Sequence, residues 1–329
     1  MKIISTITLA AATLAAASGN PMLPGARVNV VATTPDLAAL AREIGGDAVE
    51  VKALAKPTED AHFVDAKPSH IVTLNRADML IEGGAELELG WLPPLLESAR
   101  NSRISTGAPG RVVASHGIQM LEVPATFDRS RGDVHALGNP HFMIDPLNAR
   151  IIAAEIASHL AQVQPASAEA FKANLKTFDA TLDTKLAEWQ KQLEPHRGAK
   201  IVTYHKDFVY LAARFKLEVV ETLEPKPGIA PSPAHLAKVI ARMRSEHARV
   251  ILVQPYQNRR TAETVARQTG AEVVTYRSGF PLSLIGEVNP DVVLISPGPG
   301  RPADFNVPAT VRHAASLGIP VFGVCLGLQ

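Results

Sequence analysis

Two hydrophobic periods alternate along this chain, and their alternation predicts an α/β fold. Apolar stretches with helical spacing occur in the first half at 36–44 and 146–162, the second opened by Asp145 as N-cap and Pro146 at the first helical position. Strands that alternate with helices are typical of lobes built on mostly parallel sheets. The short apolar runs that we expect to be strands are Val28–Ala32, Val49–Leu54, Asp78–Ile81 and Arg111–Val113.

The segment from Ser167 to Leu193 follows a different pattern. It contains no glycine or proline, and its apolar residues recur at helical spacing. This predicts one long amphipathic helix. Because the segment lies near the middle of the chain, we expect a rigid connector between two lobes rather than a core helix of a single domain. The residues that set this spacing are Leu175, Phe178, Leu182, Leu186 and Trp189.

The second half returns to the alternating pattern and predicts a second α/β lobe. Helical patterns cover Ser232–Ser245 and Asn258–Gln268, and a further one covers Pro308–Leu317. The last two strands could extend the sheet of this lobe in parallel, so we expect the end of the chain to dock partly onto it. The expected strands are Lys200–Tyr204, Glu218–Thr222, Arg249–Val253, Glu272–Thr275, Asp291–Ser296 and Pro320–Val324.

Length and composition narrow the class of protein. A chain of 329 residues can form two domains that each bury a core. The net charge of +1 gives no electrostatic case for nucleic acid or for an acidic membrane surface. The few aromatic residues, 5%, argue against platforms that stack bases or sugars.

The first residues have the pattern of a secretory signal peptide. Lys2 supplies the positive charge, Ile3–Ala12 a short apolar run, and Ala15–Ala17 the small residues before cleavage. The apolar run is too short for a transmembrane helix. The one cysteine, Cys325, offers no lipid attachment near residue 20 and no intrachain disulfide. We therefore expect an exported, periplasmic monomer with no direct membrane insertion and no nucleic-acid partner.

Three histidines lie in settings that favour metal binding. His205 directly follows an expected strand, His62 lies in the loop after another, and His141 precedes a helix start. Open α/β sheets bind ligands at the carboxyl ends of their strands. The separations of 79 and 64 residues exclude a local zinc-finger arrangement, so tertiary structure must assemble any site. Imidazole nitrogens suit Zn²⁺ and other late divalent ions.

The remaining histidines have no such setting, and each is more often a surface or satisfied buried residue than a ligand. Among them His135 is near enough to His141 in sequence to be a reserve ligand. The residues in this group are His70, His116, His135, His159, His196, His235, His247 and His313.

The settings of His62, His141 and His205 resemble those in the metal-specific solute-binding proteins of ABC transporters. These are the zinc and manganese receptors with a helical backbone between two Rossmann-like lobes. The likeness covers roughly residues 27–275. The segments that carry it are Thr58–His62, Lys67–Ser69, Gly138–Pro146, Tyr204–Phe208 and Val253–Asn258.

This resemblance implies metal capture rather than catalysis. His62 and His141 would be ligands from the first lobe and His205 from the second, and the cargo would pass to an ABC permease in the inner membrane. A histidine at the third position favours Zn²⁺ over Mn²⁺ in such a family. The long helix would limit the lobes to small hinge adjustments. The His-rich loop of many zinc receptors is absent.

The resemblance fails at the fourth ligand, which in the family is usually an aspartate about 75 residues after the third. Here Tyr276–Pro281 contains no carboxylate. Without that carboxylate the site would be three histidines plus water. A two-lobed protein that binds no metal is therefore a second interpretation.

The end of the chain resembles class I glutamine amidotransferases, in particular the amidotransferase portion of anthranilate synthase. Pro290–Gly300 is similar to their oxyanion-region strand and loop, and Gly318–Gln329 to their nucleophile elbow, with Cys325 as the attacking thiol. In that family the histidine base and its carboxylate come well downstream, so we expect a catalytically incomplete segment. A glutamine amidotransferase fragment is the alternative function.

The expected organisation has five parts, and we expect no enzyme activity from the main part. They are a signal peptide at 1–18, an N-terminal metal-binding lobe at 19–165, a connecting helix at 166–195, a C-terminal metal-binding lobe at 196–276 and a truncated amidotransferase-like βαβ segment at 277–329.

Overall fold

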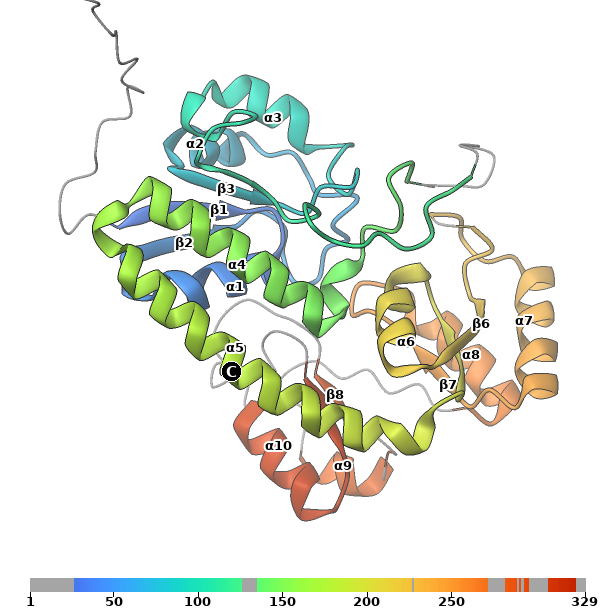
Figure 1. Cartoon of the computed structure of the whole chain (residues 1–329). Coiled ribbons are helices and arrows are strands. Elements are labelled where there is room, and N and C mark those ends of the chain that lie inside the picture. Colours follow the sequence, from blue (N-terminus) through green and yellow to red (C-terminus); the bar gives the residue numbers. More distant parts are fainter. Residues whose placement is uncertain are drawn as a thin grey trace, which may run out of the picture.

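The main part of the protein consists of two parallel sheets with helices around them and one long helix (Figure 1). This computed structural model describes residues 27–125, 135–226, 228–271, 282–288, 290, 293–295 and 307–323. Within these ranges no helix is both long and apolar enough to cross a membrane. The expected signal peptide at 1–18 and the expected strand Glu272–Thr275 lie outside them.

The first sheet has four parallel strands in the order β2-β1-β3-β4. Since all of them are parallel, their carboxyl ends lie at one edge of the sheet, and the loops that follow them meet there. The strands are β1 (Val28–Ala32), β2 (Val49–Ala53), β3 (Met79–Glu82) and β4 (Arg111–Val113).

Both faces of the first sheet are buried, as its apolar strands require. Successive side chains of a strand point to opposite faces, so Val30 and Val31 belong to different core clusters. Val30 packs with one pair of helices and Val31 with the other pair. The helices on the side of Val30 are α1 (Pro35–Gly45) and α4 (Pro146–Val163), and those on the side of Val31 are α2 (Pro68–Arg76) and α3 (Leu92–Ala99).

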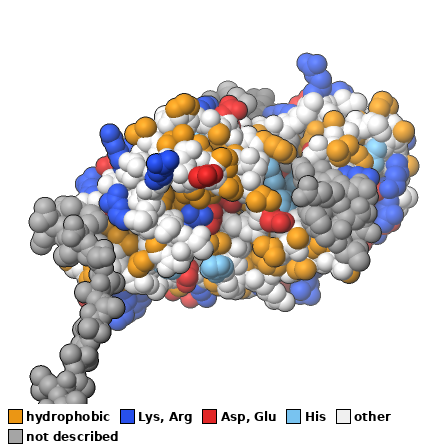
Figure 2. All heavy atoms as spheres, turned by 90° about the horizontal axis from the view of Figure 1, so that it is seen from above, with side chains coloured by type: hydrophobic (Ala, Val, Ile, Leu, Met, Phe, Trp, Pro, Cys, Tyr) orange, Lys and Arg blue, Asp and Glu red, His pale blue; other side chains and the backbone are white. Residues whose placement is uncertain are grey.

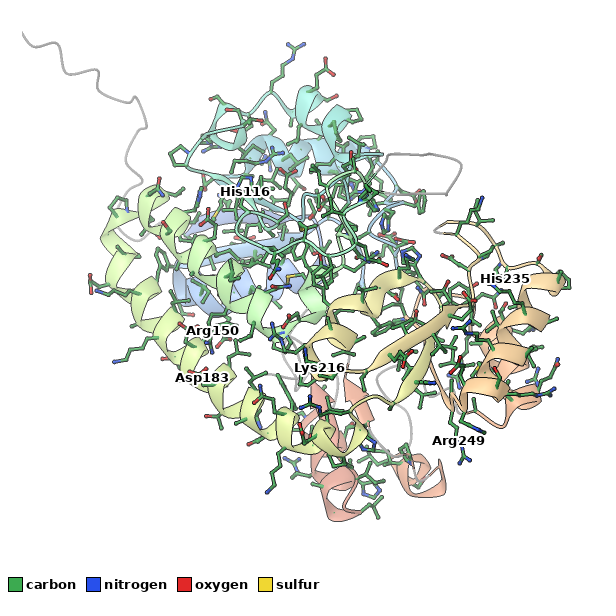
Figure 3. All side chains as sticks on the ribbon, turned by 45° about the vertical axis from the view of Figure 1, so that its right-hand side comes forward. His116, Arg150, Asp183, Lys216, His235 and Arg249 are labelled. Carbon is green, nitrogen blue, oxygen red and sulfur yellow. The ribbon has the colours of Figure 1, made fainter. Side chains whose placement is uncertain are left out.

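The long helix α5 (Ala168–Leu193) has 26 residues and spans about 39 Å at 1.5 Å per residue. It buries Phe171, Phe178, Leu182 and Trp189 in the same core cluster as the first sheet. Arg150 of α4 pairs with Asp183 on its solvent side; both are labelled in Figure 3. The predicted connecting helix is therefore present.

The second sheet has three parallel strands in the order β6-β5-β7. Val202 of β5 and Ile251 of β7 belong to its own core cluster, which also contains buried side chains from 239–243 and 262–266 of two of the helices that follow. The strands are β5 (Lys200–Thr203), β6 (Glu218–Thr222) and β7 (Val250–Leu252), and the helices are α6 (Val209–Phe215), α7 (Pro233–Glu246) and α8 (Arg259–Thr269). The predicted α/β class, with two parallel sheets and a long helix, is confirmed.

Apolar and polar contacts join the two lobes. Phe208 and Tyr210 of the second lobe share the core cluster of the first sheet. The Tyr210 hydroxyl also donates a hydrogen bond to the Asn139 carbonyl at 2.7 Å. Arg214 of α6 donates two hydrogen bonds, at 2.9 and 2.8 Å, to the carboxylate of Asp145, which caps α4. These contacts hold the lobes in one arrangement.

Near the end of the chain, a third and smaller sheet forms. The strands β8 (Val293–Ile295) and β9 (Val321–Gly323) pair in parallel, with α10 (Val307–Ser316) between them and α9 (Ser283–Val288) before them. In the described residues these strands pair only with each other, so the expectation that they extend the second sheet is wrong. Their own small core, around Ile285, Ala314 and Ile319, explains this independence.

Candidate metal centre

The three predicted histidines lie on loops at element ends. His62 lies in the loop between β2 and α2, and His205 directly after β5 at the carboxyl edge of the second sheet. His141 precedes the short 3-10 helix Phe142–Ile144, which leads into α4. Gly138 before it has a φ of 106°, and a Cβ there would come within 2.9 Å of the Leu121 carbonyl oxygen, so glycine is required in this turn.

The structure brings these three rings together. Their centroids lie 5.0 Å apart for His62 and His141, 5.0 Å for His141 and His205, and 5.9 Å for His62 and His205. One nitrogen of each ring lies within 4.8 Å of one nitrogen of each of the others. In the described part of the chain, this is the one group of three ligand-type side chains that could hold a metal ion.

Two carboxylates orient two of the rings. Asp60 Oδ1 lies 2.8 Å from His62 Nδ1, and Glu224 Oε2 lies 2.8 Å from His205 Nδ1. A carboxylate accepts the Nδ1 proton and leaves the lone pair on Nε2, the atom that faces the cluster. Both rings are thus in the tautomer that a metal ion requires.

The third ring is positioned through its backbone. The amide of His141 donates to Asn139 Oδ1 at 2.9 Å. The Asn139 side-chain amide in turn donates to Glu122 Oε2 at 3.0 Å and to the Lys206 carbonyl at 2.8 Å. Asn139 therefore ties the loop of His141, in the first lobe, to the residue that follows His205 in the second.

The charges around the cluster set its protonation. Burial, reinforced by the charges of the neighbouring histidines, holds the pKa of His141 well below its usual 6.5. Burial also lowers the pKa of His205, but the hydrogen bond that its Nδ1 donates to Glu224 and the charges of Asp207 and Glu224 outweigh it, so the net shift is upward. Burial raises the pKa of the Asp207 carboxyl to about 7. The surroundings therefore disfavour the charged form of His141 and favour the charged form of His205.

A cleft of ≈ 350 Å³ adjoins the cluster. His62 and His205 reach it, together with the two carboxylates that orient them. His141 is not one of the residues that line this cleft. Figure 2 shows histidine side chains near the middle of one face of the molecule. The other lining residues are Thr58, Phe63, Tyr204, Gly228, Tyr256, Gln257 and Asn258.

Sequence reasoning did not assign a role to Asp60 or Glu224. Asp60 precedes His62 by two positions, which was a usable signal. Glu224 follows β6, the neighbour of β5, and its closeness to His205 depends on that strand order. The region in which the resemblance led us to expect an aspartate ligand, 276–281, lies outside the described residues.

The reserve ligand His135 also lies beside the cluster. Its Nε2 is 3.1 Å from His62 Nε2, and the ring centroids are 5.2 Å apart. Burial and the charges of His62 and His205 lower the pKa of His135 to about 4. Of the other histidines, His116, labelled in Figure 3, is exposed.

Comparison with known proteins gives a consistent result for the main part of the chain. The family model described as "Zinc-uptake complex component A periplasmic" matches residues 30–281. The iron-binding protein YfeA of Yersinia pestis is 27% identical over 289 residues, which are 86% of this chain and 87% of YfeA. A crystal structure of ZnuA superposes with a TM-score of 0.63 at 23% identity, covering 74% of this chain and 89% of ZnuA.

The end of the chain matches a different family. The model of class I glutamine amidotransferases covers residues 255–329, which overlaps the first match over residues 255–281. Anthranilate synthase of Azospirillum brasilense is 59% identical over 63 residues, which are 19% of this chain but only 9% of that protein. The joined character predicted from the sequence is confirmed. Because the first model covers well over half of its length, the chain belongs to the ZnuA family of metal-binding solute-binding proteins of ABC transporters, joined to a class I glutamine amidotransferase segment.

Proposed function

We propose that this chain captures one Zn²⁺ ion between its lobes through the Nε2 atoms of His62, His141 and His205. The observation that supports this most directly is the convergence of three rings from three distant loops, with ligand atoms within 4.8 Å of one another. Two of these rings have their Nδ1 hydrogens facing carboxylates, so their lone pairs point into the cluster.

The donor set favours zinc. The family description names zinc, whereas the YfeA relative is named for iron. Three imidazoles without a carboxylate ligand suit Zn²⁺ better than Mn²⁺, which prefers oxygen donors. The two nearby carboxylates, Asp60 and Glu224, face Nδ1 atoms and are engaged there. We therefore infer zinc as the cargo, with Mn²⁺ bound much more weakly.

The proposed role is delivery, with no bond made or broken in a substrate. The protein, exported to the periplasm by residues 1–18, would hand its ion to a permease in the inner membrane. The contacts between lobes, from Tyr210 to Asn139 and from Arg214 to Asp145, hold both halves of the site in place. Capture then costs little conformational entropy, and release needs only small movements.

Zinc titration of the mature protein tests the proposal. We expect one ion per chain, and His205→Ala should weaken binding at least about 100-fold, or about 2.8 kcal/mol. The exposed His116 provides the matched control, since His116→Ala should bind as the wild type does. Unchanged affinity in His205→Ala would reject the three-histidine site, and Mn²⁺ bound as tightly as Zn²⁺ would reject the choice of metal.

A second candidate function rests on the 59% identity to part of anthranilate synthase. It is that of a glutamine amidotransferase fragment, expected to be catalytically incomplete, whose activity would be hydrolysis of glutamine with Cys325 as the nucleophile. Cys325 lies outside the described residues. Ammonia release from glutamine that is lost in Cys325→Ala would support this activity, and no release from the wild type would exclude it.

A further inference from the structure

The ring of His135 makes a contact that three ligands do not explain. It approaches the Nε2 atom of His62, the same atom that we assign to the metal ion, and does so with its own Nε2 at 3.1 Å. On the other side of the cluster, His141 Nε2 and His205 Nε2 lie 3.2 Å apart. Four Nε2 atoms are thus arranged as two close pairs.

These two separations fit a tetrahedral zinc site. With Zn–N bonds of about 2.0–2.1 Å, two ligand nitrogens of a tetrahedron lie about 3.3–3.4 Å apart. The observed pairs share no atom, so they correspond to two opposite edges, which together contain all four corners. The ligand atoms of His62, His141 and His205 lie within 4.8 Å of one another. Movements of about 1.5 Å would bring these three atoms to tetrahedral separations. His135 contacts this group through His62 and is not itself a member of it, so its ring would have to move closer to the other pair.

The chemistry of the contact also points to a cation. Because Asp60 accepts the Nδ1 hydrogen of His62, the Nε2 atom of His62 carries a lone pair. Without an ion, His135 must donate an Nε2 hydrogen to it. When His135 instead carries its hydrogen on Nδ1, the Nε2 lone pairs of His62 and His135 face each other and repel. A cation bound by both atoms removes this repulsion. This change of tautomer releases no proton.

The backbone of His135 is anchored on the side of the first lobe. The amide of Ala136 donates to Glu86 Oε2 at 2.6 Å, and the amide of Gly138 donates to the His135 carbonyl at 3.2 Å. Three residues further on, the same stretch of chain presents His141. One anchored turn therefore supplies two rings to the cluster, and the ring of His135 is half-buried there.

We propose that His135 is the fourth ligand of the metal ion, so that four imidazoles complete the tetrahedron. This rests on the proposed function of the same site. His135 would supply the fourth ligand that the resemblance leads us to expect as a carboxylate, which Tyr276–Pro281 does not contain. Four neutral ligands leave the charge of the ion at +2, so the orienting carboxylates Asp60 and Glu224 supply the compensating charge. A site of nitrogen alone also discriminates further against Mn²⁺.

Long-range proton–nitrogen NMR of the uniformly ¹⁵N-labelled, zinc-loaded chain tests this, because it reports for each histidine whether Nε2 binds metal. We expect four metal-bound rings in the wild type. In His135→Ala we expect three metal-bound rings, with zinc still bound. The zinc dissociation constant should be raised by about 10- to 100-fold, because loss of a ligand should weaken binding at least as much as loss of a ligand's hydrogen-bond partner does. His116→Ala should leave all four rings bound.

The outcomes separate this proposal from the proposed function. Three bound rings in the wild type, with affinity unchanged in His135→Ala, would overturn the role of His135 and leave the three-histidine site intact. No zinc binding by the wild type would overturn both. The count of rings in the wild type needs no variant, so a variant that failed to fold would not affect the result.

Discussion

The carboxylate of Glu224 should influence zinc affinity without contacting the ion, because it accepts a hydrogen bond from Nδ1 of His205, whose Nε2 would bind the zinc. It lies 2.8 Å from His205 Nδ1, and the side chains of Glu224 and His205 are only 17% and 14% exposed. The Glu224 carboxylate orients the ring of His205 and makes its Nε2 more basic, and Glu224→Ala removes both effects. The ion itself would lose no ligand, so any change in affinity measures this indirect contribution.

The geometry sets the size of the effect. A hydrogen bond to a charged group contributes about 1.5–3 kcal/mol when water is largely excluded. Loss of the partner of a metal-bound histidine typically weakens metal binding by about 10- to 100-fold, or about 1.4–2.8 kcal/mol. We therefore expect Glu224→Ala to raise the zinc dissociation constant within that range. Glu224→Gln, which still accepts a hydrogen bond, should raise it by about tenfold or less.

Competition with a chromophoric zinc chelator at pH 7.5 measures these constants. The matched control is Glu221→Gln, which alters the same stretch of chain but whose partner is the exposed Lys238, 3.1 Å away. A surface pair of this kind contributes little, so its affinity should equal that of the wild type. If Glu224→Ala, Glu224→Gln and the wild type bind zinc equally, the argument that Glu224 supports His205 is wrong.

Three further predictions concern pH and stability. The pKa of His205 is raised above 6.5, so as the pH is lowered the zinc affinity should already decrease before pH 6.5 is reached. Glu224→Ala should move the start of this decrease to lower pH. The same starting pH in the variant and the wild type would contradict this. Burial raises the pKa of Asp207 to about 7, so the folded chain keeps a proton that the unfolded chain loses near pH 4, and the stability of the metal-free protein falls between these values. Asp207→Asn should therefore stabilise the metal-free protein at pH 8 by up to about 4 kcal/mol more than at pH 4 in urea unfolding, and a gain independent of pH would refute this. Arg214→Ala leaves the Asp145 carboxylate, 9% exposed, without its partner and should cost about 2 kcal/mol of unfolding free energy, whereas no change in the urea midpoint would show that this contact between lobes is dispensable.

Much of the fold could be predicted from the sequence because the spacing of apolar residues and the positions of glycine and proline determine helices and strands locally. The helix expected from Ser167 to Leu193 is observed from Ala168 to Leu193, since no glycine or proline interrupts it. Its buried face includes Phe171, which lies outside the spacing used for the prediction. The strand ends were predicted within one or two residues in most cases.

The convergence of the three histidines was anticipated through the resemblance of their settings to those of metal receptors, because His62 and His205 follow strands of different sheets and His141 precedes a helix. The residues around them could not be anticipated. Glu224 faces His205 only because β6 pairs with β5, and the order of strands in a sheet cannot be predicted from the local pattern of apolar residues. The contact between His135 and His62 joins loops 73 residues apart. The small sheet of β8 and β9 has a core of its own, which hydrophobic pattern alone does not distinguish from an extension of the second sheet.

Anomalous diffraction at the zinc edge, from crystals of the zinc-loaded chain, tests the central claim most directly. We expect one strong peak between the lobes, about 2.0–2.1 Å from the Nε2 atoms of His62, His141 and His205. A peak that is bonded to none of these three rings, or the absence of any peak between the lobes, would contradict the account.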